Sequence, residues 1–145
     1  MTVLSSYTID DLTVGMRASL SKVIDDEAIR AFADVSGDHN PVHLDDAFAA
    51  STRFKTRIAH GMLSASLIST VIGMQLPGQG TIYLSQSLNF RAPVHCGDEV
   101  TASVEITEID QRRRRVTLAC EVKVGDVIVV DGEAKVLAPA AKAQG

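Results

Sequence analysis

The chain has 145 residues, of which 46% are hydrophobic and 22% charged, proportions that suit a single globular domain with a substantial core. Its net charge of −4 gives no electrostatic reason to expect a nucleic acid or an anionic membrane as partner. Cys96 and Cys120 lack CxxC spacing, which argues against a disulfide framework and a thiolate metal site and indicates a reducing compartment. Since no signal peptide opens the chain and its longest apolar segment, at about 62–74, is too short to span a bilayer, a cytoplasmic protein without a membrane partner is expected.

The front half of the chain predicts helices and loops. Residues 14–23 could form a first strand. A helix is expected after it, with its N-cap at Asp25 or Asp26 and its end near Gly37. Its apolar residues recur at helical spacing: Ile29, Phe32 and Ala33. A short helix over about 45–50 is expected to follow.

Residues 60–74 predict the longest helix, of about 22 Å for fifteen residues. Its large apolar residues are Met62, Leu63, Leu67, Ile68, Val71 and Ile72. The remaining residues are mostly small, so neighbouring elements can enclose this helix on nearly all sides, and a central, buried position is expected. The sequence LPGQG at 76–80 ends it.

Hydrophobic residues in the back half recur at every second position, which is typical of antiparallel strands with one face in water. Residues 82–90 predict one strand, with Ile82, Leu84, Leu88 and Phe90 on a single face. Three further runs each place alternating residues on one face: Val100, Ala102, Val104 and Ile106; Val116, Leu118, Cys120, Val122 and Val124; Val130, Gly132, Ala134 and Val136. The pair Gly125-Asp126 favours a tight hairpin between the last two strands.

The long helix and the sheet both need burial, and no other element is available to cover them. An antiparallel sheet of four strands, with residues 14–23 as a possible fifth, is therefore expected to wrap around the helix. This predicts an α+β fold and a single domain over residues 1–145, with an ordered core at about 12–139.

The stretch SGDHNPVHLD, residues 36–45, gathers an acid, an amide and two histidines around a proline. One interpretation is structural, with Asp38 and Asn40 forming turns and His43 satisfied within a loop. The other is an acid/base pair of Asp38 and His43. Pro41 disfavours a continuous helix, so His39 and His43 do not form an i, i+4 pair of metal ligands, and no metal is expected.

Gly61 opens the long helix, and a glycine there leaves backbone N–H groups unobstructed at the positive end of the helix dipole. Such a position suits a developing oxyanion, although a plain N-terminal glycine is the alternative. An acid/base pair together with an oxyanion donor is what proton chemistry beside a carbonyl requires.

The sequences DHNPVH, AHGMLSASL and GTIYLSQSLNFRAPVHCGDEV together resemble the MaoC-like (R)-specific enoyl-CoA hydratases, in particular the short bacterial type that supplies polyhydroxyalkanoate synthesis. The resemblance extends from about Leu12 to Pro139. Its D-x-N-P-x-H pattern is specific to the hydratase and dehydratase branch, whereas related thioesterases place their carboxylate elsewhere. The resemblance implies a hot-dog fold, in which a five-stranded antiparallel sheet wraps around a long central helix.

The resemblance also implies a reaction, the addition of water to a trans-2-enoyl-CoA to give (R)-3-hydroxyacyl-CoA. The acyl-CoA thioester is then the substrate and no separate cofactor is expected. Asp38 and His43 would activate one water, and the Gly61 N–H would meet charge on the thioester oxygen. Asn40 would fix the loop or orient the pair, and Ser66 is a candidate for the pocket wall, with simple packing as the alternative.

The resemblance implies a homodimer with a continuous sheet and with substrate tunnels close to the subunit boundary. Three other functions are considered: an (R)-3-hydroxyacyl-ACP dehydratase using the same residues, an acyl-CoA thioesterase, and an acyl-CoA-binding module without turnover. The basic run at 112–115 could suggest a nucleic-acid patch, but its place between two alternating runs favours a solvated hairpin tip, and no nucleic-acid partner is expected.

Overall fold

The computed structural model describes residues 4–141, so both ends of the predicted domain, 1–3 and 142–145, lie outside the described residues. In chain order the elements are the 3₁₀ turn η1 (Ile9–Asp11), β1 (Arg17–Val23), α1 (Asp26–Ser36), α2 (Pro41–Leu44), α3 (Asp46–Ala50), α4 (Gly61–Met74), β2 (Ile82–Phe90), β3 (Glu99–Asp110), β4 (Arg115–Val124) and β5 (Val127–Leu137). No helix within 4–141 is long and apolar enough to cross a membrane.

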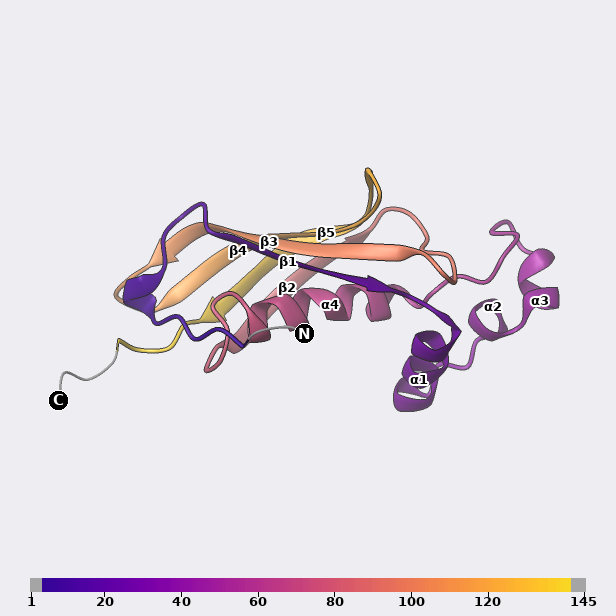
Figure 1. The fold of residues 1–145 in the computed structure, drawn as a ribbon, viewed down its shortest axis with the longest axis horizontal. Helices are drawn as coiled ribbons and strands as arrows, with labels where there is room; N and C mark the ends of the chain where they lie inside the picture. The colour runs from indigo at the N-terminus through magenta and orange to yellow at the C-terminus, as the bar shows by residue number, and fades with distance from the viewer. Residues whose placement is uncertain (1–3, 142–145) are drawn as a thin grey trace.

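The five strands form one antiparallel sheet in the order β1-β3-β4-β5-β2. Helix α4 runs along one face of this sheet, and α1, α2 and α3 lie together beyond one of its ends (Figure 1). The predicted α+β architecture is confirmed, including the fifth strand before the helix. The arrangement is a hot-dog fold.

The core forms where the alternating face of the sheet meets α4. The inward residues of β3, β4 and β5 are buried, among them Val104, Ile106, Leu118, Val122 and Val136. From α4 the core receives Leu63, Leu67, Ile68, Val71 and Ile72. Each large side chain of this kind contributes about 1.5–3 kcal/mol when it leaves water. Cys120 is buried in the same layer, as its alternation predicts.

Helix α4 is less enclosed than its composition suggests. The sheet covers one side of it, while a stripe of residues on the other side stays exposed: Met62, Ser66, Ser69, Thr70 and Gly73. Small residues permit close packing but do not require it, and within this chain the described residues provide nothing that covers the stripe.

The predicted face of β2 is correct for Leu88 and Phe90 and wrong for Ile82. Its pairing with β5 shifts between Tyr83 and Ser85, so the inward phase changes within the strand. Tyr83 and Gln86 pair with the buried Val136 and Ala134, and they therefore share the inward face with Leu88 and Phe90. A β-bulge adds one residue to a strand and moves every following side chain to the opposite face, which an alternation pattern cannot show.

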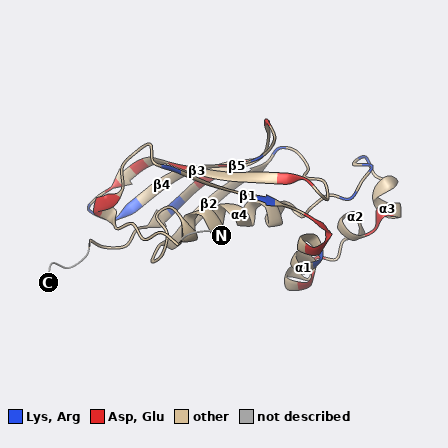
Figure 2. Ribbon diagram, in the orientation of Figure 1, with Lys and Arg blue, Asp and Glu red and all other residues tan. Residues whose placement is uncertain are grey.

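Two loops also refine the predictions. Strand β1 starts at Arg17 rather than at Val14, because Val14 and Gly15 form a turn with a positive φ of 96° at Gly15. The run from Arg112 to Arg115 sits at the β3–β4 hairpin, at the end of the sheet opposite to α1–α3 (Figures 1 and 2), so the interpretation as a hairpin tip is confirmed.

Candidate active site

The loop between α1 and α2 is built by short hydrogen bonds of the turn type. Helix α1 ends at Gly37, whose positive φ of 80° turns the chain. Asp38 Oδ1 accepts the Asn40 N–H at 3.2 Å, and Asn40 Oδ1 accepts the Val42 N–H at 3.1 Å. Asn40 thus caps α2, and Pro41 is the first residue of that helix, a position where its missing N–H costs nothing.

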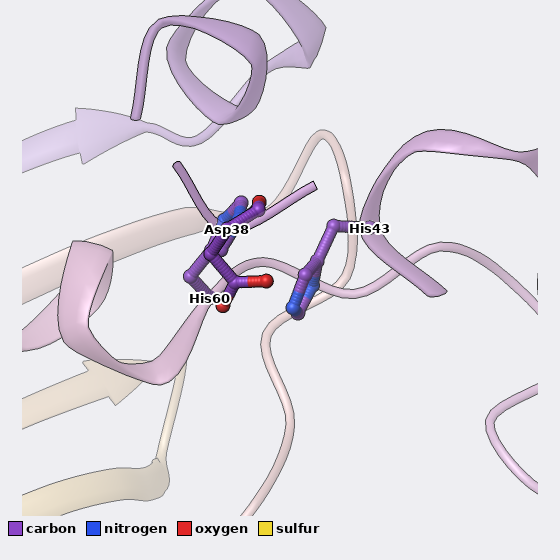
Figure 3. Close-up of side chains that lie close together, drawn as sticks. All are labelled: Asp38, His43 and His60. Atoms are coloured by element: carbon purple, nitrogen blue, oxygen red, sulfur yellow. The ribbon is translucent and has the colours of Figure 1, made fainter. Parts of the chain in front are cut away.

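His43 is the third residue of α2, only 8% exposed, and has a defined tautomer. Its Nδ1 lies 2.7 Å from the Ile58 carbonyl oxygen, which can only accept, so Nδ1 carries the hydrogen. The lone pair of a neutral His43 is therefore on Nε2. One ligand atom each of Asp38, His43 and His60 lie within 4.8 Å of one another, and the Asp38 carboxylate points toward the His43 ring (Figure 3).

His60 supports this pair through its ring. It is 3% exposed, and its ring stacks on the His43 ring at 3.8 Å between centroids and also contacts Phe32. Its Nε2 donates to the backbone oxygen of Asp38 at 2.9 Å. His60 therefore holds the Asp38 backbone and the His43 ring in fixed relation.

Arg57 holds the backbone of His43. Its guanidinium is buried, donating from Nε to the His43 carbonyl oxygen at 2.7 Å and from a terminal nitrogen to Asp26 on α1 at 2.6 Å. Asp26 is also bonded by Arg30, and these two arginines hold the pKa of Asp26 below its ordinary value. Arg57 thus holds the main chain of His43, and the Ile58 carbonyl holds its ring.

Burial lowers the pKa of His43, and the neighbouring His60 adds to that effect. The Ile58 carbonyl and the Asp38 carboxylate oppose it, but the net direction is downward from the ordinary value of 6.5. His43 is therefore neutral at pH 7, with its Nε2 able to accept a proton.

This lowered pKa predicts where activity is lost in acid. If neutral His43 is required, kcat/KM for a trans-2-enoyl-CoA falls in acid with a midpoint below 6.5, the ordinary value for histidine. The measurement is the pH profile of crotonyl-CoA hydration by wild type and by His39→Gln. His39 is exposed and its pKa is raised by Asp34, so its loss leaves the acid limb in place. An acid limb centred above 6.5 contradicts the assignment.

The three clustered side chains do not suit a metal ion. His43 Nδ1 and His60 Nε2 are both committed to carbonyl oxygens, which leaves one nitrogen on each ring. A ring nitrogen binds a metal in the plane of its ring, and the two planes are stacked with an angle of 26° between them. Two such nitrogens cannot both point at one ion. His39 lies apart from them, bonded to Asp34.

Gly61 is the first residue of α4, and its N–H is open. The first N–H groups of a helix have no partner within it, and His60 provides no side-chain cap. A Cβ at position 61 would stand 2.8 Å from two ring carbons of Phe90, so any larger residue there would require that ring to move. A cavity of about 270 Å³ lies beside Gly61 and Phe90 and includes Ile58, Ala59 and Val94 in its wall.

The predicted site residues thus divide into two groups. Asp38 and His43 come together, and Gly61 starts the helix directly after His60. Asn40 fixes its own loop, which is one of the two roles expected for it. The Ser66 hydroxyl donates to the Leu63 carbonyl, and Ser66 does not line the cavity beside Gly61.

The sequence interpretation missed three residues at this site: Arg57, His60 and Ser64. Arg57 and His60 lie shortly before Gly61 in the sequence, and this closeness to a predicted site residue was the one feature that could have pointed to them. Their partners, however, lie 14 to 31 residues away along the chain, and no local pattern marks such contacts.

Comparison with known proteins gives the family. The MaoC like domain model matches residues 12–128. The chain is 52% identical over 130 residues to the 3-hydroxybutyryl-CoA dehydratase of Methylorubrum extorquens, covering 90% of this chain and 83% of that protein. It is 50% identical over 129 residues to the (R)-specific enoyl-CoA hydratase of Aeromonas caviae, covering 88% and 96%.

Solved structures agree with these relatives. The (R)-hydratase from A. caviae involved in PHA biosynthesis has a TM-score of 0.87 over 88% of this chain and 98% of that one. R-hydratase PhaJ1 from Pseudomonas aeruginosa has a TM-score of 0.91 at 43% identity, over 100% and 96%. The matched domain, the identities and the shared fold together place this chain in the MaoC-like domain family, on its hydratase and dehydratase branch.

Proposed function

We propose that this protein adds water to trans-2-enoyl-CoA thioesters and forms (R)-3-hydroxyacyl-CoA. The observation that carries the proposal is the Asp38 carboxylate pointing toward the ring of a buried, neutral His43, next to the open N-terminus of α4. Nδ1 of that ring is bonded to the Ile58 carbonyl, so Nε2 is the nitrogen available to the water. Relatives at about 50% identity that carry this activity in their names support the same reaction and a CoA substrate. The PHA role of the A. caviae protein supports a supply of precursors for that polymer.

The Asp38 carboxylate and the Nε2 of neutral His43 both accept hydrogen bonds, so one water can donate a hydrogen to each of them. A lone pair of that water then faces the electrophilic β-carbon. As the new C–O bond forms, one of the two side chains takes a proton and the electrons of the double bond shift toward the α-carbon and the thioester oxygen. The pair then passes a proton to the α-carbon, so that both side chains end as they began.

The N-terminus of α4 suits the charge that develops on the thioester oxygen. The Gly61 N–H and the positive end of the helix dipole stabilise this oxygen more strongly in the transition state than in the ground state. The electron sink is the thioester itself, and the reaction therefore proceeds without a cofactor.

Different substrates and readouts separate this proposal from its alternatives. Loss of enoyl absorbance with crotonyl-CoA reports hydration, and chiral analysis of the product identifies the (R) form. A higher kcat/KM on crotonyl-acyl-carrier protein than on crotonyl-CoA favours the dehydratase of acyl-carrier-protein substrates. Release of free thiol identifies a thioesterase, and saturable CoA binding with no turnover identifies a binding module.

We also propose that two copies pair through β2, in a reducing, cytoplasmic compartment consistent with two unpaired cysteines. Both β1 and β2 are sheet edges, but they differ in character. The exposed residues of β1 include Arg17, Ser19 and Lys22, whereas β2 exposes large apolar side chains: Ile82, Tyr83, Leu84 and Phe90. An unpaired, apolar edge favours pairing with another strand, and a second copy would also approach the exposed stripe of α4.

This pairing predicts the effect of one charge on the edge. Wild type is expected to show a mass of about twice 15.5 kDa in size-exclusion chromatography with light scattering, and Leu84→Lys is expected to shift it toward the single chain. Ser19→Lys places the same charge on the other edge and is expected to leave the dimer intact. A monomeric wild type, or a Leu84→Lys variant that dimerises as strongly, contradicts pairing through β2.

A further inference from the structure

The cavity beside Gly61 contains an unused polar group. Ser64 lines it, is only 1% exposed, and its hydroxyl has no hydrogen-bond partner among the protein groups of residues 4–141. Buried hydroxyls in proteins are almost always paired, and an unpaired one destabilises the folded state. Nearby serines on the same helix behave differently, since the Ser66 hydroxyl donates to the Leu63 carbonyl. The orphaned group at Ser64 therefore indicates a ligand rather than a structural bond.

Ser64 and Gly61 belong to the same side of α4. Residues three apart in a helix lie on one face, and side chains lean toward the helix N-terminus. The Ser64 hydroxyl consequently stands one turn inside the N–H groups proposed to meet the thioester oxygen. Both residues line the same cavity, together with the Phe90 ring.

The rim of the cavity is basic, whereas its inner wall is apolar. Arg53 and Arg91 are both exposed and line it. Arg53 stacks over the Phe54 ring at 4.9 Å and takes part in no ion pair among the described residues, while Arg91 pairs with Asp131. Figure 2 shows basic residues on the loop after α3, in a protein whose net charge is negative. The apolar part of the lining includes Ala92, Pro93 and Val130.

We propose that this cavity binds the pantetheine arm of the acyl thioester, with the Ser64 hydroxyl hydrogen-bonded to an amide of that arm and Arg53 facing the phosphates. The assignment rests on the proposed function, because it takes the substrate to be a CoA thioester. A pantetheine arm alternates short apolar segments with amides and ends in phosphate. These groups match the apolar lining of the cavity, its single hydroxyl at Ser64 and its two exposed arginines. An acyl chain would leave the hydroxyl unpaired.

Because the Ser64 hydroxyl bonds no other described protein group, Ser64→Ala separates an effect on binding from an effect on the fold. Its removal is expected to leave the melting temperature of the free protein within about 2 °C of wild type. Removing a bond to the ligand weakens binding of CoA by about 3- to 10-fold. A residue with a merely structural role would lower stability without lowering affinity selectively.

The experiment is calorimetric titration of the whole protein with CoA and with pantetheine, which lacks the phosphates. Ser64→Ala is expected to weaken both ligands by the same factor. Arg53→Gln is expected to weaken CoA alone, more strongly at low salt. Thr70→Val removes a hydroxyl bonded to the Ser66 carbonyl on the same helix, and Lys55→Gln removes a charge from the Arg53 loop; both are expected to match wild type.

Two results would overturn the assignment: unchanged affinity of Ser64→Ala for both ligands, or a change confined to the preference for acyl-chain length. The second would place the acyl chain in this cavity. The proposed function is tested separately by hydration of crotonyl-CoA in the same preparations. A wild type that binds CoA without hydrating crotonyl-CoA refutes the function, whereas active Ser64→Ala with wild-type affinities refutes the cavity assignment alone.

Discussion

Asp38→Asn and His43→Gln are each expected to lower kcat for hydration of crotonyl-CoA by about 10²- to 10⁴-fold, the usual loss when an acid/base group is removed. The amide of Asp38→Asn would keep the shape of the side chain but could not take a proton. The amide of His43→Gln could still donate to the Ile58 carbonyl, but it offers no basic nitrogen to the water. Steady-state assays following enoyl absorbance measure both losses.

The two variants are expected to stay folded, because neither removes a large apolar side chain from the core. Asp34→Asn is the matched control, since Asp34 is exposed on α1 and pairs with His39 rather than with the site. It removes the same charge and should keep normal activity. Near-normal hydration by Asp38→Asn or His43→Gln, in protein with a native melting curve, would end the assignment of this pair.

Arg57→Met is expected to lower kcat by about 10- to 100-fold while the KM for crotonyl-CoA changes little, because small displacements of a catalytic group carry costs of this size. Arg57 is a positioning residue that fixes the His43 carbonyl and Asp26 without contacting the proposed substrate. Methionine leaves that carbonyl without a partner, and the variant should lose about 1–3 kcal/mol of stability. Enzyme kinetics and chemical denaturation measure the two effects.

Arg30→Met is the control for Arg57→Met. Arg30 also bonds Asp26, but it is exposed, and exposed ion pairs contribute about 0–1 kcal/mol. Its loss should leave kcat unchanged. Arg57→Lys restores one charge and one donor and is expected to recover part of the activity. If Arg57→Met has wild-type kcat despite lower stability, the guanidinium supports the fold alone and does not position His43.

The sheet could be predicted because most of its strands alternate without interruption. Val100 to Ile106 and Val116 to Val122 bury every second residue, and the structure matches them position for position. Strand β2 could not be read in this way, because a bulge near Leu84 reverses its phase. A bulge depends on the partner strand as much as on its own sequence, so the inward positions of Tyr83 and Gln86 required coordinates.

The same distinction holds at the candidate site. The closeness of Asp38 to His43 and the place of Gly61 at the start of α4 could be predicted because short local patterns mark these residues. The catalytic roles that the family resemblance gives them stay a prediction. The environment of His43 could not be predicted. It comes from Arg57 and Ile58, in the loop before α4, and from the His60 ring stacked on His43. Ser64 carried no signal in the sequence either, since only its burial without a partner sets it apart from the other serines of α4.

A crystal structure of the wild-type protein with butyryl-CoA, which is saturated and cannot be hydrated, tests the central claim most directly. The predicted result places the thioester oxygen within hydrogen-bonding distance of the Gly61 N–H. It also places the β-carbon against a water shared by Asp38 and the Nε2 of His43. A thioester bound elsewhere, or an Asp38 carboxylate turned away from His43 when the ligand is bound, would contradict the account.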